Sequence, residues 1–336
     1  MDIIIQTQKN FFNSIIFYLK KYKLKNHITP NNFVLILAYY YLCRKFSNYL
    51  YKNTYLILKS LKPIQNKIKK ESGEVIKEIK NDLQNEIKDL HPYYRIPTNG
   101  FSKGDILKLL KQMKPLTSFN HLEGKVSGAV YSNNKDLDNL LIDVYPYFMK
   151  SNPLHTNVFP SIRKMENDLV NMMIHLFNGD KNVCGTFTSG GTESILLACK
   201  TYKKMLKKKQ PNIIVSSTAH CAFKKACQMF DINYIEIPSL SDGKMDLKLL
   251  SNTINENTIL VVASAPSYNL GIIDPIYEIS QITTKYKIPL HIDCCMGAFL
   301  ANFLEDKYDF SISGVTSISA DIHKYGMSPK GASVIL

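Results

Sequence analysis

Several features that mark whole classes of protein are missing from this chain of 336 residues. Its seven cysteines are scattered and odd in number, and no two of them form a CxxC pair. We therefore expect free thiols in a reducing compartment rather than a disulfide framework. Cys221 and Cys227 have no His or Cys at metal-ligand spacing, and we expect no metal. The adjacent Cys294 and Cys295 lie in an apolar run and are expected to pack in the core.

Nucleic-acid-binding motifs are also absent, although the net charge is +14. Residues 1–90 contain 16 Lys or Arg against 7 Asp or Glu, whereas residues 91–336 contain 26 against 21. Because the basic excess is concentrated in a segment without such a motif, we expect a membrane surface as the partner and no nucleic acid. A basic arm that is merely solvated is the alternative.

The sequence also lacks an uninterrupted run of the about 20 apolar residues that span a bilayer. FVLILAYYYLC at residues 33–43 is uncharged, but a span over residues 31–51 would carry Arg44 and Lys45 past its middle. No small-residue cleavage site follows, which argues against a signal peptide. We expect residues 1–62 to form a membrane-anchor or interfacial segment. An apolar arm docked on the rest of the chain is the alternative.

A helical period is present in residues 63–90, where apolar residues recur mainly at three- and four-residue steps between charges. We interpret this stretch as a spacer helix that packs one stripe of side chains. The following HPYYRIPTNG, at residues 91–100, contains two prolines and a glycine that break the helix. We place a domain boundary there and expect one large domain over residues 91–336.

From about residue 160 onward, helical and strand patterns alternate. This alternation predicts an α/β fold with a mostly parallel sheet of seven strands and helices on both faces. The predicted strands are 183–189, 212–217, 233–238, 258–265, 289–295, 314–320 and 331–336. The predicted helices are 162–177, 192–209, 221–230, 246–254 and 275–286.

Ligands of such sheets bind beyond the carboxyl ends of the strands, so the residues that follow each strand are the candidates for a site. TSGGTES, residues 188–194, places two glycines at a strand-to-helix turn, where backbone N–H groups and the helix dipole favour a phosphate. It lacks the Lys-Ser/Thr of a Walker motif, and an ordinary capped helix is the alternative. His220 follows the second strand and could stack on a ring, act in acid–base chemistry or cap the next helix.

Two charged residues follow later strands. Asp293 comes directly after the fifth strand, where a buried carboxylate needs a cationic partner; a helix-capping Asp is the alternative. Lys324 follows the sixth strand, and a buried lysine with a depressed pKa suits imine formation; a surface lysine is the alternative. Together these features offer a phosphate cradle, a stacking ring, an acid for a pyridinium nitrogen and an amine for an aldehyde. They meet the demands of pyridoxal 5′-phosphate, which we predict as the cofactor.

Longer motifs agree with this prediction. The chain contains GKVSGAVYS, SNPLHTNVFPSIRKMENDLV, TSGGTESILLACK, YKIPLHIDCCMGAFL and GVTSISADIHKYGMSPKG. From about residue 90 to the end it resembles the sphingosine-1-phosphate lyase family. This family belongs to the fold type I pyridoxal-phosphate enzymes related to the group II decarboxylases. DCCMGA at residues 293–298 departs from the usual DACLGG, and NLG at residues 269–271 departs from PHG; neither change touches a proposed catalytic side chain.

The resemblance implies a role for each matching residue. Lys324 is the Schiff-base lysine and the catalytic residue, Asp293 pairs with the pyridine nitrogen, and His220 stacks on the ring. Gly191 and Thr192 hold the cofactor phosphate, with His323 nearby. The substrate phosphate is held by Tyr131, His155 and Lys330, with Asn152 in the same pocket.

The family also implies a function and a setting. We expect cleavage of sphingoid base phosphates to a fatty aldehyde and phosphoethanolamine by a homodimer. Its membrane would be that of the endoplasmic reticulum, with the catalytic domain facing the cytosol; a cytoplasmic protein is the alternative. Fold type I enzymes carry a second, smaller domain after the large one, and we expect that domain to be missing here. An amino-acid decarboxylase of the same superfamily and an inactive, membrane-tethered homologue are the rival interpretations.

Overall fold

The computed structural model describes residues 61–86, 93–113, 123–300 and 303–336. These fall into two units, one ending at Ser118 and one beginning at Phe119. The first unit contains α3 (Lys62–Glu86) and α4 (Lys103–Met113), and α4 was not predicted. α3 covers the predicted spacer helix up to residue 86, and the apolar side chains along it, such as those of Val75 and Ile79, are about half exposed.

The predicted membrane segment lies almost entirely outside the described residues, and so does the candidate span 31–51. Within the described part of the chain, none of the helices has the length and apolar character needed to cross a bilayer. The membrane prediction is therefore untested by the structure.

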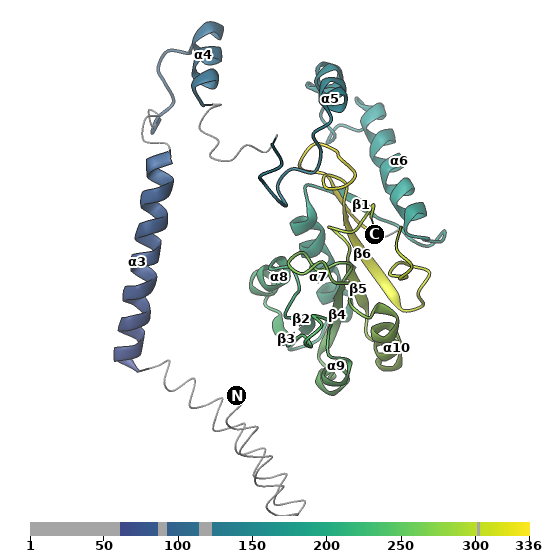
Figure 1. Ribbon diagram of the computed structural model, residues 1–336. Coiled ribbons are helices and arrows are strands. Elements are labelled where there is room, and N and C mark those ends of the chain that lie inside the picture. Colours follow the sequence, from purple (N-terminus) through teal and green to yellow (C-terminus); the bar gives the residue numbers. More distant parts are fainter. Residues whose placement is uncertain (1–60, 87–92, 114–122, 301–302) are drawn as a thin grey trace, which may run out of the picture. The chain divides into compact units, whose positions relative to one another are not determined.

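A seven-stranded sheet forms the centre of the second unit (Figure 1). Its strands are β1 (Thr186–Thr188), β2 (Asn212–Ser216), β3 (Asn233–Ile237), β4 (Thr258–Ser264), β5 (Leu290–Asp293), β6 (Val315–Asp321) and β7 (Ser333–Ile335). Their order is β1-β7-β6-β5-β4-β2-β3. β7 pairs antiparallel with β1 and β6, and the other pairs are parallel. The prediction of a mostly parallel sheet of seven strands is confirmed.

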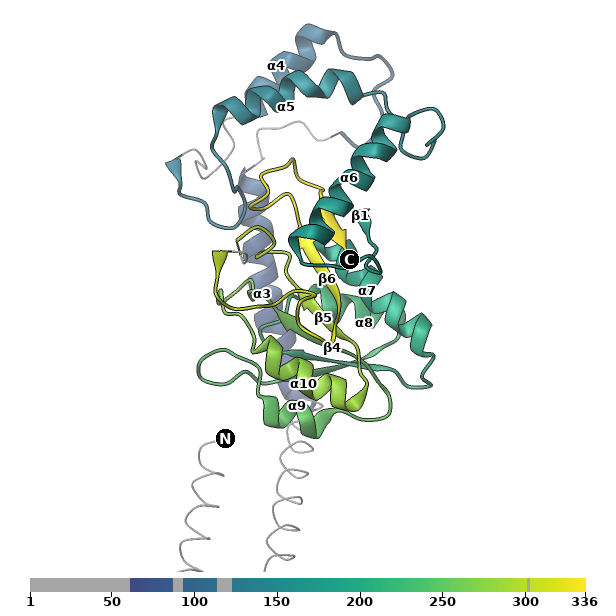
Figure 2. The same ribbon diagram turned by 90° about the vertical axis from the view of Figure 1, so that its right-hand side faces the viewer.

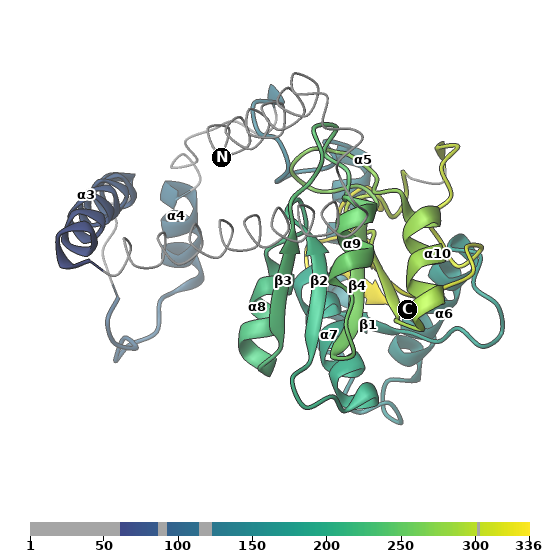
Figure 3. The same cartoon turned by 90° about the horizontal axis from the view of Figure 1, so that it is seen from below.

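Helices cover both faces of this sheet, as predicted (Figures 2 and 3). One face carries α6 (Pro160–Leu176), α9 (Leu247–Thr253) and α10 (Ile276–Tyr286), and the other carries α7 (Gly191–Leu206) and α8 (Ala222–Phe230). A further helix, α5 (Lys135–Phe148), was not predicted and has no buried residue. Its N-terminus is capped by Asn134, whose side-chain oxygen accepts hydrogen bonds from the N–H groups of Asp136 and Leu137.

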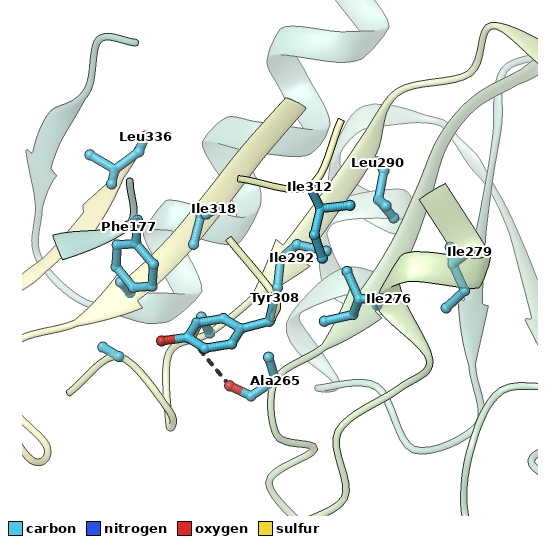
Figure 4. Close-up of a cluster of buried hydrophobic side chains, with 14 of the residues drawn as sticks. Phe177, Ala265, Ile276, Ile279, Leu290, Ile292, Tyr308, Ile312, Ile318 and Leu336 are labelled. Atoms are coloured by element: carbon cyan, nitrogen blue, oxygen red, sulfur yellow. Dashed lines mark hydrogen bonds between the residues drawn. The ribbon is translucent and has the colours of Figure 1, made fainter. Parts of the chain in front are cut away.

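Successive side chains of the central strands point to opposite faces of the sheet and pack into two separate hydrophobic cores. In β2, Ile214 packs into the cluster under α6, α9 and α10, whereas Ile213 and Val215 pack under α7 and α8. Every residue of β2, β4 and β5 is buried, as expected for parallel strands covered on both faces. Figure 4 shows part of the larger cluster, including Phe177 and Ile292. This packing makes the sheet a rigid support for the residues at its carboxyl edge.

Candidate active site

A cavity of about 320 Å³ lies at the carboxyl ends of β1, β5 and β6. Its lining includes all six residues predicted to bind the cofactor: Gly191, Thr192, His220, Asp293, His323 and Lys324. Because β5 and β6 are adjacent and parallel, they deliver Asp293 and the segment after β6 to the same edge of the sheet. The structure therefore brings the predicted cofactor residues together, although they come from four separate segments of the chain.

The turn between β1 and α7 is shaped by two glycines with different tasks. Gly190 has a φ of 151°, a conformation that favours glycine. Gly191 opens α7, and a Cβ placed on it would lie 2.7 Å from Cys295 Sγ and 2.8 Å from Asp321 Oδ1. No side chain caps the helix start. The first N–H groups of a helix lack intrahelical acceptors, so this turn presents free donors to an anion.

Glu193 stabilises this turn through hydrogen bonds with Ser189. Neither residue was predicted to have such a role. The Oε2 of Glu193 accepts hydrogen bonds from the backbone N–H of Ser189 (2.6 Å) and from the Ser189 hydroxyl (2.7 Å). These bonds, the backbone one first, lower the pKa of Glu193. The spacing of Ser189 and Glu193 across the first helical turn is the signal in the sequence that could have revealed the pair.

Lys324 is paired with a carboxylate that the sequence analysis missed. Its Nζ lies 3.1 Å from Oδ2 of Asp321, the last residue of β6. Asp321 is buried, and its Oδ1 has no hydrogen-bond partner among the described residues. The argument that selected Asp293, a carboxylate at the end of an apolar strand, applies equally to Asp321 and could have found it.

The expectation of a depressed pKa for Lys324 is wrong for the protein without its cofactor. Burial lowers the pKa of Lys324, but the Asp321 carboxylate raises it by attraction and by its hydrogen bond, so the net shift is upward. The ammonium form of Lys324 is therefore stabilised.

Asp293 ends β5 and is also buried. Its Oδ1 accepts hydrogen bonds from the backbone N–H of Cys295 (3.1 Å) and from the Ser319 hydroxyl (3.3 Å). Both donors are neutral, so the cationic partner expected for Asp293 is not Lys324, which pairs with Asp321. A carboxylate held in this way at the cavity wall can face a positively charged ligand group.

The two histidines of the cavity are fixed by different contacts. His220 Nδ1 accepts a hydrogen bond from the backbone N–H of Ala222 (3.1 Å) at the start of α8, a contact that matches capping, one of the three roles considered for this residue. The His220 ring also meets Tyr268 edge-on at 5.2 Å. His323 Nδ1 lies 2.7 Å from the carbonyl oxygen of Ala332, and its Nε2 lies 3.7 Å from Asp321 Oδ2.

Two of the four residues predicted to hold the substrate phosphate lie together near Lys324. Lys330 Nζ is 4.5 Å from the centroid of the Tyr131 ring, which in turn packs edge-on against Tyr325 at 5.3 Å. The pKa of Lys330 is lowered by burial and then by repulsion from Lys324, so the two ammonium groups are close enough to interact. This pair forms a basic patch beside the attachment lysine.

The other two residues, Asn152 and His155, lie in a separate exposed turn before α6. Asn152 Oδ1 accepts a hydrogen bond from the N–H of Leu154 (3.0 Å), and the N–H of His155 donates to the carbonyl oxygen of Asn152 (3.1 Å). Neither residue lines the cavity around Lys324. Among the described residues, no contact therefore joins Asn152 or His155 to Lys330 and Tyr131, and their phosphate-binding role stays a prediction.

The cavity suits pyridoxal 5′-phosphate. Its volume is in the range of small-ligand sites, the glycine turn leaves room and free N–H groups for the phosphate, and Lys324 supplies the amine. With Asp293 also lining the cavity, this edge of the sheet is that of an α/β protein of the pyridoxal-phosphate-binding class.

Comparison with known families agrees with this class. Residues 111–336 match the model described as the pyridoxal-dependent decarboxylase conserved domain. The chain belongs to this family, and the match confirms the predicted cofactor.

The similar proteins also confirm the resemblance to sphingosine-1-phosphate lyases. The chain is 44% identical to rat sphingosine-1-phosphate lyase 1 over 72% of its own length and 44% of the relative's. It is 38% identical to the lyase of Dictyostelium discoideum, over 90% and 58% of the two lengths. The structure of the sphingosine-1-phosphate lyase of Burkholderia pseudomallei matches with a TM-score of 0.70 and 30% identity, over 74% of this chain and 61% of that one. The chain spans about half the length of the curated relatives it matches.

Proposed function

We propose that this chain is a pyridoxal-phosphate-dependent carbon–carbon lyase, or the cofactor-binding part of one. It cleaves sphingosine 1-phosphate and related sphingoid base phosphates to a fatty aldehyde and phosphoethanolamine. The observation that carries the proposal is the basic patch of Lys330 and Tyr131 next to Lys324. A second cationic group beside the attachment lysine is what the doubly charged phosphate of a phosphorylated amine requires.

The chain's own residues divide the chemistry among them. Bound pyridoxal phosphate supplies an electron sink for the negative charge that develops on the substrate carbon. Lys324 attaches the cofactor and, once released, carries a proton at Nζ. Asp293 would face the ring nitrogen and would favour its protonated form. Asp321 accepts a hydrogen bond from Lys324 and orients its amine, while the turn at Gly191 holds the cofactor phosphate.

The substrate phosphate carries a charge of roughly −1.5 to −2 at neutral pH. Lys330 offers it a charge-assisted hydrogen bond. The Tyr131 ring packs under the Lys330 ammonium, and the Tyr131 hydroxyl donates to the carbonyl oxygen of Gly128 (3.1 Å). We propose that Asn152 and His155 complete this phosphate site, on the strength of their match to the family motif. A sphingoid chain would extend away from the basic patch.

The setting proposed for the enzyme rests on the sequence. The basic, apolar segment 1–62 supports attachment to the endoplasmic reticulum membrane through a span or an interfacial helix, the helix over 63–90 acts as the spacer, and the catalytic domain over 91–336 faces the cytosol. The homodimer rests on the resemblance alone. Detergent-free fractionation of cells expressing the tagged chain, with and without residues 1–62, tests the attachment.

One assay tests the proposed reaction. The purified chain, loaded with pyridoxal phosphate, is incubated with sphingosine 1-phosphate, and phosphoethanolamine and fatty aldehyde are quantified by mass spectrometry. We expect both products in equal amounts and none from the Lys324→Ala variant. Release of carbon dioxide from amino acids instead would favour the decarboxylase, and absence of any turnover would favour the inactive homologue.

A pair of matched variants tests the phosphate site. Lys330→Ala removes a charge-assisted hydrogen bond, so we expect KM for sphingosine 1-phosphate to rise about tenfold or more. The control is Lys285→Ala, which removes another lysine that lies over a tyrosine ring, 5.7 Å from the centroid of Tyr286 on α10. Equal KM values for the two variants would contradict the role of Lys330.

A further inference from the structure

A hydrogen-bonded chain of five buried polar side chains runs from α7 to the wall of the cavity. It begins at Tyr202 on α7, passes through Ser317 on β6, His291 on β5 and Ser319 on β6, and ends at Asp293. These residues are all buried, and His291 and Ser319 have no exposed surface. Polar groups this deep need partners, so the contacts between them decide how each is oriented.

The distances join the five residues without a gap. Tyr202 donates its hydroxyl hydrogen to Ser317 Oγ (2.8 Å), and Ser317 Oγ lies 2.8 Å from His291 Nδ1. On the other side of the ring, His291 Nε2 lies 3.2 Å from Ser319 Oγ. Ser319 then donates to Asp293 Oδ1 over 3.3 Å.

The direction of each hydrogen bond follows from counting hydrogens. An ionised Asp293 can only accept, so the single hydroxyl hydrogen of Ser319 is used on it. Ser319 therefore has to accept from His291, and Nε2 carries the ring proton. A neutral imidazole has one N–H, so Nδ1 accepts from Ser317, which has its own oxygen free for the Tyr202 hydroxyl. The Nε2–H tautomer of His291 therefore satisfies every hydrogen bond of this chain.

The surroundings keep the ring neutral. Complete burial lowers the pKa of His291 to about 3. Phe223 of α8 packs edge-on against it with the ring centroids 5.9 Å apart. Ser319 also accepts a weak hydrogen bond from Cys295 Sγ (3.4 Å), which leaves its own hydrogen for Asp293.

We propose that His291 is a positioning residue for the cofactor: as the Nε2–H tautomer, which Ser317 complements by donating to Nδ1, it directs the Ser319 hydroxyl onto Asp293 and keeps that carboxylate oriented. The role of Asp293 toward the ring nitrogen rests on the proposed function. The hydrogen-bonded chain from Tyr202 to Asp293 does not depend on that function. Ser317, which touches neither Asp293 nor the cavity, acts on the cofactor only through the tautomer.

The tautomer is measured first, on the cofactor-free chain. Long-range ¹H–¹⁵N spectra of the ¹⁵N-histidine-labelled protein distinguish the two ring nitrogens, and the His291→Gln variant identifies the signal. We expect a protonated Nε2 and an unprotonated Nδ1 that do not change between about pH 5 and 8. An Nδ1–H tautomer, or titration near the ordinary histidine value of about 6.5, overturns the proposal.

Cofactor affinity is measured next, by equilibrium dialysis of pyridoxal phosphate against three variants. Ser319→Ala removes the donor to a charged group, so we expect about a tenfold weaker affinity. Ser317→Ala removes the donor to Nδ1, so the Nε2–H tautomer loses one of its two partners, and affinity should weaken in the same direction by less. Tyr202→Phe is the matched control, because Ser317 still donates to His291, and it should stay close to wild type.

The outcomes separate this proposal from the proposed function. Equal affinities for Ser317→Ala and Tyr202→Phe overturn the proposed positioning role of His291. A Ser319→Ala affinity equal to that of wild type overturns it as well. If wild-type protein binds no pyridoxal phosphate, the proposed function fails. The spectrum that reports the His291 tautomer still decides whether the hydrogen bonds of the chain point toward Asp293. Circular dichroism of each variant shows that it is folded, and Ser317→Ala keeps the test sharp if Ser319→Ala is not.

Discussion

The burial of His291 makes the stability of the fold depend on pH in a calculable way. In the folded chain the pKa of His291 is about 3, whereas the ordinary value is 6.5. Below pH 6.5 the unfolded chain takes up a proton that the folded chain does not, so stability falls as the pH falls from 6.5 toward 3. Each pH unit within this window costs about 1.4 kcal/mol. Lowering the pH from 7 to 5 should therefore cost about 2 kcal/mol from this residue alone.

Urea denaturation at pH 5, 6 and 7, followed by circular dichroism, measures the effect. Other titrating groups also contribute, so the decisive quantity is the difference between wild type and His291→Gln. Glutamine does not titrate, and its amide nitrogen can take the place of Nε2 in donating to Ser319. We expect the variant to be less stable at pH 7 but to lose about 2 kcal/mol less than wild type on going to pH 5.

The reasoning would be refuted by parallel stability curves for the two proteins. It would also be refuted by a wild-type curve that is flat between pH 5 and 7 while the His291 ring titrates there. A change in the urea dependence between pH values would show that the transition itself had changed, and the comparison would then rest on the midpoints at each pH.

Three further predictions concern the cavity wall and the thiols. Asp321→Asn leaves the partly buried Lys324 ammonium without its counter-charge, so we expect about 2 kcal/mol lower stability and a lower Lys324 pKa, read from the pH dependence of acetylation with Lys285 as internal reference; an unchanged acetylation profile contradicts this. Gly191→Ala forces a Cβ to 2.7 Å from Cys295 Sγ, so we expect about 1–3 kcal/mol of destabilisation and loss of pyridoxal phosphate binding. Its control is Gly73→Ala, where nothing lies within 4 Å, and similar losses in both variants would exclude the steric explanation. Burial raises the pKa of the core thiols, that of Cys199 to about 12, so a thiol reagent at pH 8 should label the exposed Cys184 and Cys221 quickly and the buried Cys199, Cys227, Cys294 and Cys295 only after unfolding; fast labelling of a buried thiol in the native chain would contradict the packing.

Sequence patterns were sufficient for the central strands of the sheet because β2 and β4 are short, mainly apolar runs buried on both faces. β2 and β4 are fully buried, so no polar residue interrupts them, and the turn signals between strands and helices are strong. α5 was not predicted because it precedes the alternating strand and helix patterns that begin at about residue 160, and it contains Pro146, a residue that usually interrupts a helix.

The candidate site divides in the same way. Lys324, Asp293, His220 and Gly191 could be found from the sequence because each lies at or within a few residues of the end of a predicted strand, and parallel strands bring such positions to one edge. Asn152 and His155 rested on motif similarity, and the contacts of their turn do not join them to the cavity.

What the sequence determined by itself was therefore the layered α/β fold and the set of residues at its carboxyl edge, because both follow from local periodicity and from one topological rule. The tertiary structure alone decided which of those charges pair. It assigned Lys324 to Asp321 rather than to Asp293, and it lined up His291 and Ser319 behind Asp293. Pairing depends on distances of a few ångströms between neighbouring strands, and the register that sets those distances is a property of the assembled sheet.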